Sequence, residues 1–551
     1  MSRPSELLDI DKASATKYAI LVAIVLAIAE VTIIIYNLYF HPLRHFPGPI
    51  LYRASRVPWG IQFATGRQAF FVQKLHDEYG PVVRIGPNHL SFTDPKAWKD
   101  IYGHRVGGES SMNEMTKSET FTKPIRDRPE TIITMNRQDH SKFRRALSHG
   151  FSDSAMRQQE PVIAKYIDLL ISRLHEECDN GKKKCNLEAW YNWTTFDVVG
   201  DLVFGQSFHC LENIDYHPWI ESLFNSVRFS AIMIALTYMG FGDLVQVIAK
   251  FGTSLRKARK FTRDMLNVRL AVEGKRDDLF EGIVKKREEW PKSSSADIFL
   301  PTQNIPFDTL TANAFILVIA GSETTATTLS GATALLLTHP DILEKLQQEV
   351  RSSFKSADEI TITSVNKLYY MLAILNEALR LYPPVTSGLV RTVPKGGEHI
   401  AGQYVPGGTL VEVQQWSMNH SNENWNDPWA FQPERFLATS EAAAKAGNKL
   451  DSLQPFSTGP RNCIGRNLAY AEMRLILARI IFEFDLKLSD DSKQWIERQD
   501  AYLLWDRSVS LLLSVFPKFG KVVRGPTRSN DSHLLRPLKG ANPPQRNPNA
   551  G

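Results

Sequence analysis

The sequence predicts a mainly α-helical fold with a small β region, arranged as a single large domain behind an N-terminal transmembrane helix. Three observations predict it. An apolar run occupies residues 18–36, short β-like pieces begin near residue 81, and helical periodicity dominates residues 139–381. The 551 residues contain no visible internal repeat, so we expect one unit rather than a solenoid or a propeller.

The composition is that of an ordinary globular protein, with 43% hydrophobic and 23% charged residues. The net charge of +6 is modest, and no dense Lys/Arg block is interleaved with aromatic residues. We therefore expect no nucleic-acid partner. The four cysteines are too few and too scattered for the disulfide framework of a secreted protein, which indicates a reducing compartment.

Residues 18–36 form the predicted membrane anchor. The run is apolar except for Glu30 and Thr32, and it is long enough to cross a bilayer as a helix. A cleaved signal peptide is the alternative, but the run exceeds a usual signal core and no clear small-x-small cleavage site follows it. An ionised Glu30 costs a few kcal/mol near mid-membrane, which the neighbouring Leu, Ile and Val side chains outweigh. We expect a short segment at 1–17 and a single-pass anchor at 18–40.

The predicted catalytic domain spans residues 41–525. It begins with a proline-rich stretch at residues 41–50, which forms a stiff hinge between the membrane and the body. The apolar segment 228–250 is interrupted by Gly240 and Gly242, so a second transmembrane helix is not expected there. This segment is either a buried helix pair or an element that rests on the bilayer surface.

Three later segments have clear local signals. Residues 293–306 are polar and contain proline, which predicts a linker, and residues 307–340 follow as one long helix ended by His339-Pro340. Residues 526–551 are rich in Pro, Asn, Arg and Gly, and a disordered tail is expected because they cannot bury enough apolar surface.

A single cysteine, Cys463, lies in the loop FSTGPRNCIG at residues 456–465, just before a helical pattern. A helix N-terminus and the adjacent Arg461 both favour a thiolate, the form of cysteine that binds metals. Gly459 and Gly465 leave room for a flat ligand against the loop. The alternative is a buried structural cysteine beside a chance Gly-rich turn.

This loop resembles the cysteine-ligand signature of the cytochrome P-450 family, Phe-x-x-Gly-x-Arg-x-Cys-x-Gly. The fixed positions are occupied by Phe456, Gly459, Arg461, Cys463 and Gly465. The resemblance covers roughly residues 41–521. It implies the cytochrome P-450 fold and a haem b (iron protoporphyrin IX) cofactor, with Cys463 as the axial ligand of the iron.

A second resemblance lies in residues 377–380, Glu-Ala-Leu-Arg. Glu377 and Arg380 share a helix face, where such a pair is usually a solvated surface pair. Residues 433–436, Pro-Glu-Arg-Phe, add Arg435 in the order that the family uses for its Glu-Arg-Arg triad. The resemblance implies a buried hydrogen-bonded network behind the cysteine loop, with a structural role.

A third resemblance is Ala-Gly-Ser-Glu-Thr-Thr at residues 320–325, similar to the family's segment above the haem. Cleavage of bound dioxygen needs protons, and Glu323 followed by Thr324 can relay them through water, while Gly321 leaves room for the oxygen. The alternative is that hydroxyls on this helix only bond their own backbone carbonyls.

The family also uses cationic side chains to hold the haem propionates. Its frequent Trp-x-x-x-Arg pattern corresponds here to His140 and Arg144, with histidine in place of tryptophan. Arg391 and Arg461 lie where the family commonly places further propionate partners, and Phe456 belongs to the same cofactor-binding loop.

The resemblance implies a monooxygenase that inserts one oxygen atom from O2 into a small hydrophobic substrate. The general sequence pattern is similar to that of fungal members that oxidise terpenoids, polyketides or alkaloids in secondary metabolism. No flavin or dinucleotide fingerprint is present, so a separate NADPH-dependent flavoprotein reductase must supply the electrons. Lys142, Arg145 and Arg466 are predicted to form its docking patch.

Anchored relatives usually face the cytosol from the endoplasmic reticulum membrane, in which case the sequons at Asn192 and Asn419 stay unglycosylated. Two alternatives remain: a haem-thiolate isomerase or dehydratase that needs no reductase, and a non-catalytic haem protein that senses or carries a small ligand. The pair of Glu323 and Thr324 argues against both.

Overall fold

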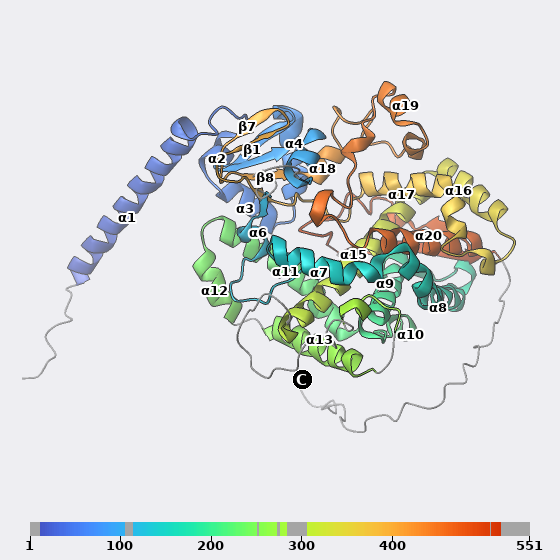
Figure 1. Ribbon diagram of the computed structural model, residues 1–551. Helices are drawn as coiled ribbons and strands as arrows, with labels where there is room; N and C mark the ends of the chain where they lie inside the picture. The colour runs from blue at the N-terminus through green and yellow to red at the C-terminus, as the bar shows by residue number, and fades with distance from the viewer. Residues whose placement is uncertain are drawn as a thin grey trace, which may run out of the picture. The chain divides into compact units, whose positions relative to one another are not determined.

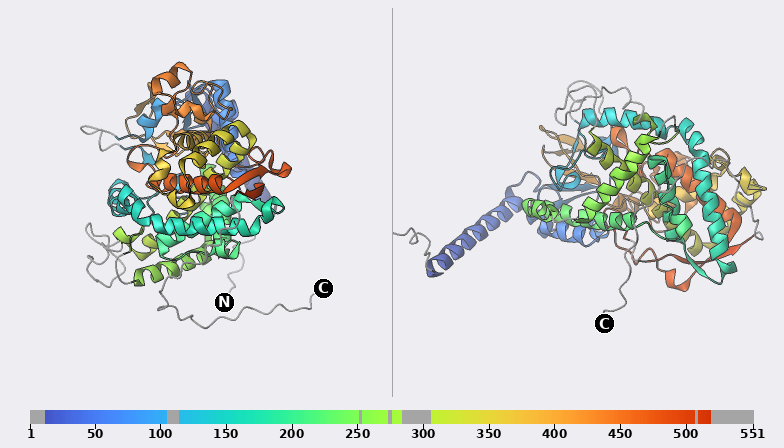
Figure 2. Two further views of the ribbon diagram at one scale, coloured as in Figure 1. Left: turned by 90° about the vertical axis from the view of Figure 1, so that its right-hand side faces the viewer. Right: turned by 90° about the horizontal axis from the view of Figure 1, so that it is seen from below.

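The computed structural model describes residues 12–104, 114–250, 253–272, 276–283, 306–506 and 509–518. The predicted tail at 526–551 lies outside these residues, as does the predicted linker at 293–306 except for Pro306. The predicted fold class is confirmed. Helices form most of the body, and the sheet that contains β1 (Val82–Gly86) and β8 (Leu410–Val413) lies on one side of it (Figures 1 and 2).

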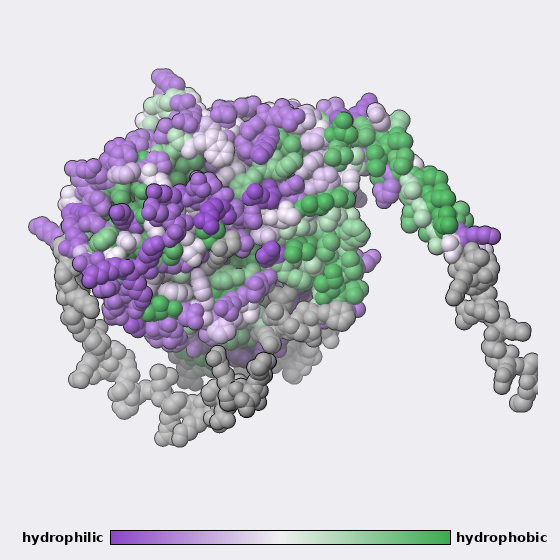
Figure 3. All heavy atoms as spheres, turned by 180° about the vertical axis from the view of Figure 1, so that it is seen from behind, coloured by the Kyte–Doolittle hydropathy of each residue, from purple (hydrophilic) through white to green (hydrophobic). Residues whose placement is uncertain are grey.

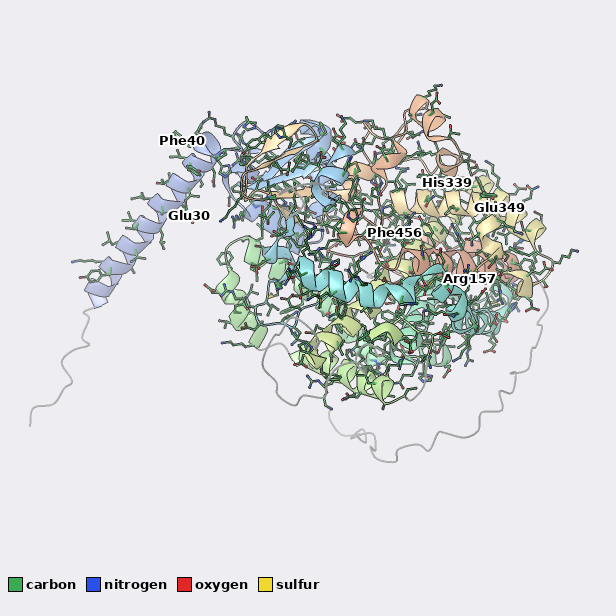
Figure 4. All side chains as sticks on the ribbon, viewed as in Figure 1. Glu30, Phe40, Arg157, His339, Glu349 and Phe456 are labelled. Atoms are coloured by element: carbon green, nitrogen blue, oxygen red, sulfur yellow. The ribbon has the colours of Figure 1, made fainter. Side chains whose placement is uncertain are left out.

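The N-terminal helix α1 (Lys12–Ile35) continues into a π-helical turn, η1 (Tyr36–Phe40). The span Thr16–Phe40 has a mean hydropathy of 2.7 in its most apolar window, none of which is buried, and at 1.5 Å per residue it is roughly 37 Å long. By length and composition it can cross a bilayer. The helix begins before residue 18 because helical hydrogen bonding does not require apolar side chains. Glu30 lies on the same helix (Figure 4).

A small mixed sheet packs beside the first helices of the body. Its strand order is β1-β2-β8-β5-β3, and β1 and β2 are short strands of the kind predicted near residue 81, paired antiparallel. The short strands β3 and β5 pair antiparallel with Lys117 opposite Arg391, so the sheet brings together two cations far apart in sequence. The remaining members are β2 (His89–Phe92), β3 (Thr116–Lys117) and β5 (Arg391–Thr392), flanked by α2 (Ile50–Ala54), α3 (Val57–Ala64), α4 (Gln68–Tyr79) and α5 (Lys96–Tyr102).

The helical body is built around α15 (Phe307–Thr338), which ends where Pro340 begins the next helix, as predicted. It packs along α9 (Leu187–Phe204), every residue of which is buried. The other long helices are α7 (Arg137–Ser148), α8 (Asp153–Glu177), α11 (Pro218–Tyr238), α13 (Thr253–Ala271), α16 (Pro340–Ser353), α17 (Tyr369–Leu381) and α20 (Arg466–Glu483). Shorter elements are α6 (Glu119–Thr122), α10 (Cys210–Asn213), α12 (Gly242–Lys250), α18 (Gln415–Asn419), α19 (Ser440–Lys445), β4 (Lys184–Asn186), β6 (Glu398–Ile400), β7 (Gln403–Val405), β9 (Phe484–Leu488) and β10 (Leu512–Pro517).

One part of the apolar segment 228–250 is buried in the body and the other part is exposed. The end of α11 is core, because Ile234 and Tyr238 are buried against Trp59 of α3. After Gly240, which has φ +101°, α12 turns its apolar side chains outward. Figure 3 shows an apolar area on the body in addition to the apolar helix α1. By length and composition α11 could also span a membrane, but 39% of its apolar window is buried inside the protein.

Both sequons lie inside the folded body. Asn192 and Asn419 are 1% and 0% exposed, and their amides donate to the carbonyls of Glu188 (3.0 Å) and Arg380 (3.0 Å). The folded domain therefore does not present either asparagine to a glycosylating enzyme.

Candidate active site

The loop that carries Cys463 is held tightly against the body. Gly459 has φ +75°, and a Cβ there would lie 1.8 Å from the carbonyl oxygen of Tyr102, at the end of α5. The amide of Cys463 donates to the carbonyl of Phe456 at 2.8 Å, which closes the loop. Gly459 is therefore required both by its left-handed backbone and by the close approach. Phe456 is labelled in Figure 4.

Cys463 is the exposed member of the four cysteines, and Arg144 is the charged neighbour of its thiol. Its sulfur is accessible to solvent, yet burial raises the pKa of Cys463, against the lowering effects of the Gly465 amide and Arg144. In the protein without haem, burial outweighs these lowering effects, and the expected thiolate at Cys463 stays a prediction. Helix α20 begins only at Arg466, and Arg461 turns to another partner. A metal ion would supply the missing effect, because metal coordination deprotonates a thiol.

A cluster of cations lies at the cysteine loop, because Arg461 of that loop and Arg144, which bonds Asn462, belong to it. Burial and the cations Arg461, Lys117, Arg144 and Arg391 lower the pKa of His140 to about 3, so this imidazole is neutral at physiological pH. Burial and the neighbouring arginines also hold the pKa of Lys117 well below its ordinary value.

The carboxylate that pairs with this cluster within the described residues is Glu114. Burying several cations with a single carboxylate is unfavourable unless a further anion is bound. The two carboxylates of a haem would provide the missing negative charge. Arg391 and Arg461 both line a cavity of about 60 Å³ at this place.

The residues predicted to hold propionates all belong to this cluster, because Arg144, Arg391 and Arg461 each lower the pKa of His140. Arg144 also binds the cysteine loop itself. Its two terminal nitrogens donate to the carbonyl and the side-chain oxygen of Asn462, at 2.7 and 2.6 Å. Sequence reasoning missed Lys117, because only the pairing of β3 with β5 places it beside Arg391.

The structure brings Glu377, Arg380 and Arg435 together in one buried network. Arg380 makes a two-pronged contact with Glu377, at 2.7 and 2.8 Å, and Arg435 approaches the same carboxylate at 3.2 Å. The remaining donors of Arg380 reach the carbonyls of Asn419 and Pro428 at 2.7 and 2.6 Å. These bonds tie α17 to the loops that precede the cysteine segment.

Helix α15 presents a few accessible residues within a largely buried surface. Ala320 is exposed and Thr324 is half-buried, whereas Glu323 is 3% exposed. The Thr324 hydroxyl donates to the carbonyl of Ala320 at 2.7 Å, which is the local bond considered as the alternative to a relay. Thr325 bonds Glu472 of α20, a carboxyl whose pKa burial raises to about 8, and which the sequence did not single out.

Comparison with known proteins gives the family. The family model described as Cytochrome P450 matches residues 52–512. This chain belongs to the cytochrome P450 family. Cytochrome P450 monooxygenase tpeC of Talaromyces stipitatus is 47% identical, over 91% of this chain and 96% of that protein. Trichothecene C-15 hydroxylase of Fusarium sporotrichioides is 41% identical, over 87% of this chain and 94% of that protein. Averantin hydroxylase of Dothistroma septosporum is also 41% identical, over 87% of each chain.

As a member of this family, the P450 is an oxidoreductase with a haem-thiolate cofactor that receives electrons from a redox partner. Its curated relatives are fungal monooxygenases of secondary metabolism. The residues of this site fit this group, because they combine an exposed cysteine with an excess of positive charge.

Proposed function

We propose that this P450 inserts one oxygen atom from O2 into a terpenoid, polyketide or alkaloid of a fungal biosynthetic pathway. Haem b is the proposed cofactor, and NADPH supplies the electrons through a separate flavoprotein reductase. The observation that carries the proposal is the exposed Cys463, in a loop whose Arg461 lies in one cluster with Lys117, Arg391 and neutral His140. Two relatives that are named as hydroxylases support hydroxylation as the reaction.

Each residue has a distinct role in this proposal. Cys463 ligates the iron, and when bound the thiolate-ligated haem supplies the activation of dioxygen. Lys117, Arg391 and His140 hold the haem carboxylates, and Arg144 holds the cysteine loop through Asn462. Glu323 and Thr324 hold and pass a proton next to the accessible surface at Ala320.

Electrons are proposed to enter through the face behind the cysteine loop. Lys142 and Arg145 on α7 and Arg466 at the start of α20 are all exposed. Opposite charges on a reductase would speed the encounter with this face. Reversing these three charges is expected to lower reductase-driven turnover, and unchanged turnover would count against this docking face.

The anchor at 18–40 is proposed to hold the catalytic domain, residues 41–525, on the cytosolic side of the endoplasmic reticulum membrane. The exposed apolar helix supports the anchor, and the orientation rests on the family resemblance. A protease-protection assay on microsomes that leaves the domain intact would contradict it.

The decisive experiment is spectroscopic. The purified chain, reduced and bound to carbon monoxide, is expected to show the absorption band of thiolate-ligated haem, and Cys463→Ala is expected to lose it. NADPH consumption with a reductase then separates an oxygenase from an isomerase, a dehydratase or a ligand sensor. Product analysis in a strain that lacks the gene would identify the substrate.

A further inference from the structure

Arg461, expected from the family resemblance to hold a haem propionate, directs three of its five N–H donors to protein groups. Its Nε and Nη2 lie 3.0 and 2.9 Å from Oε1 of Glu114, and its Nη1 donates to the carbonyl of Met135 at 2.8 Å. The second carboxylate oxygen of Glu114 faces Nε of Arg137 at 3.7 Å. The side chains of Arg461 and Glu114 are only 8% and 19% exposed.

This arrangement affects which cations can bind the cofactor. A haem carboxylate that approached Arg461 would meet the negative charge of Glu114, in a partly buried place where like charges repel more strongly than in water. Lys117 is differently placed: it spends one of its three donors on the carbonyl of Ile133, at 2.6 Å. Arg391 lies over the ring of Tyr102, at 5.3 Å from its centroid.

We propose that Glu114 is the permanent counter-ion of Arg461, and that the two form a latch which closes the segment before β3 onto the loop of Cys463. In this arrangement the haem carboxylates are carried by Lys117, Arg391 and His140. Arg461 then acts on the cofactor only through the position of the loop. The inference rests on the proposed haem site and reassigns one residue within it.

The latch joins three parts of the chain that the sequence keeps apart. Glu114 precedes β3, which carries Lys117, and Met135 precedes α7, which carries His140 and Arg144. Arg461 contacts both Glu114 and Met135 from within the cysteine loop. The same loop is already pinned to Tyr102 by the close approach at Gly459. Opening the latch would therefore loosen the cofactor's cysteine ligand and its carboxylate partners together.

A double-mutant cycle on the holoenzyme tests this directly. Glu114→Gln, Arg461→Met and the double variant are compared by the rate of haem transfer from the ferric enzyme to excess apomyoglobin. Each single change is expected to speed haem loss on the order of tenfold, and the double variant should be no faster than the faster single variant, because each change opens the same latch. The reduction potential of Glu114→Gln should also shift to a more positive value, since a negative charge near the iron is lost.

Two outcomes would overturn the latch. One is haem loss from Glu114→Gln that is unchanged or slower than wild type. The other is multiplication of the two single effects in the double variant, which would mean that the two side chains act on haem retention independently. Glu119→Gln, an exposed carboxylate on the adjacent helix α6, is the matched control and should leave haem loss unchanged. Should Glu114→Gln not be recovered with haem, Glu114→Asp takes its place in the cycle, with the same two outcomes.

This test separates the two proposals. A wild-type protein without the thiolate band refutes the proposed haem-thiolate function itself. A wild-type protein with that band, combined with independent effects of the two substitutions, refutes only the latch.

Discussion

Thr324 combines an accessible position with a hydroxyl that is already bonded. It is half-buried beside exposed Ala320, and it donates to that residue's carbonyl at 2.7 Å. A hydroxyl that donates to a backbone carbonyl still accepts hydrogen bonds through its oxygen. A proton from Glu323 or from water can therefore reach this oxygen while the local bond persists. Thr324 can therefore keep its bond to the Ala320 carbonyl and take part in a proton relay at the same time.

Thr324→Ala removes this oxygen and should uncouple the P450. We expect NADPH oxidation to continue while product per NADPH falls about tenfold and peroxide rises, because proton delivery contributes factors of this size or more. Product, NADPH and peroxide are measured in the same reaction. Thr328→Ala is the control, because Thr328 makes the same type of bond one turn later but is 2% exposed. Tightly coupled turnover in Thr324→Ala would contradict the relay.

Glu412 is a buried carboxyl that the proposed chemistry does not use. It is 1% exposed in β8, and its Oε2 lies 3.9 Å from Nε2 of His89. Burial lowers the pKa of His89 to about 3, so this imidazole supplies no positive charge, and burial raises the pKa of Glu412 to about 8. Between pH 4.5, the ordinary pKa of this carboxyl, and about pH 8, Glu412 is protonated in the native state and ionised in the unfolded state. The contribution of Glu412 to stability falls as pH rises from about 4.5 to about 8.

Glu412→Gln removes this titration and should protect the protein at alkaline pH. The melting temperature of the variant, relative to wild type, is expected to increase steadily between pH 6 and pH 8, because only the wild type must ionise a buried acid. Thermal unfolding at several pH values measures the difference. Glu423→Gln, at an exposed site, is the control and should show no such trend. A constant difference across this range would show that Glu412 is already ionised at neutral pH.

At the scale of elements, short stretches of sequence predicted where helices lie and end, and which side chains share a helix face. The apolar run marked α1, and the proline after His339 marked the end of α15. The spacing of Glu377 and Arg380 on α17 was also local, and the family resemblance added Arg435. The neighbours of Arg391 were not predictable, because the pairing of β3 with β5 depends on the whole sheet. For the same reason the sequence did not reveal the contact between Glu114 and Arg461.

Helix α17 has a cap that comes from another helix. Its own N-cap residue, Leu368, makes no side-chain bond, but Glu349 of α16 (Figure 4) accepts from the amides of Tyr370 and Met371, at 2.8 and 2.9 Å. A carboxylate at a helix N-terminus satisfies free amides and complements the helix dipole. Because α17 also carries Glu377, this cap supports the network behind the cysteine loop.

Glu349→Ala should lower the free energy of unfolding by about 1 to 2 kcal/mol, the usual range for a lost cap. Glu344→Ala, an exposed position on the same helix, is the control and should change stability by less than about 0.5 kcal/mol. Denaturant unfolding of the holoenzyme compares the two. Equal stability of the two variants would show that the amides of α17 find another partner.

At the scale of the whole molecule, the membrane contact predicted from the anchor extends to the surface of the body. Phe241, just before α12, and Leu244 and Val247 on α12 are exposed, as are Ile50 and Leu51 on α2, all of them 50% exposed or more. A soluble surface rarely exposes so many large apolar side chains near one another, and such areas commonly mark membrane or protein contacts. The apolar area in Figure 3 therefore predicts that the body binds lipid without α1.

A chain that lacks residues 1–35 tests this prediction. The truncation removes α1 but keeps Asn37, which is buried and accepts a bond from Arg84 at 3.0 Å. The shortened protein is expected to sediment with phosphatidylcholine vesicles. Phe241→Ser, Leu244→Ser and Val247→Ser together should reduce its partition by more than about tenfold, because each apolar side chain contributes about 1.5 to 3 kcal/mol when it leaves water. Serine at exposed Trp429 and Leu437 is the control. If both sets of variants bind alike, the exposed side of α12 serves a contact other than the bilayer.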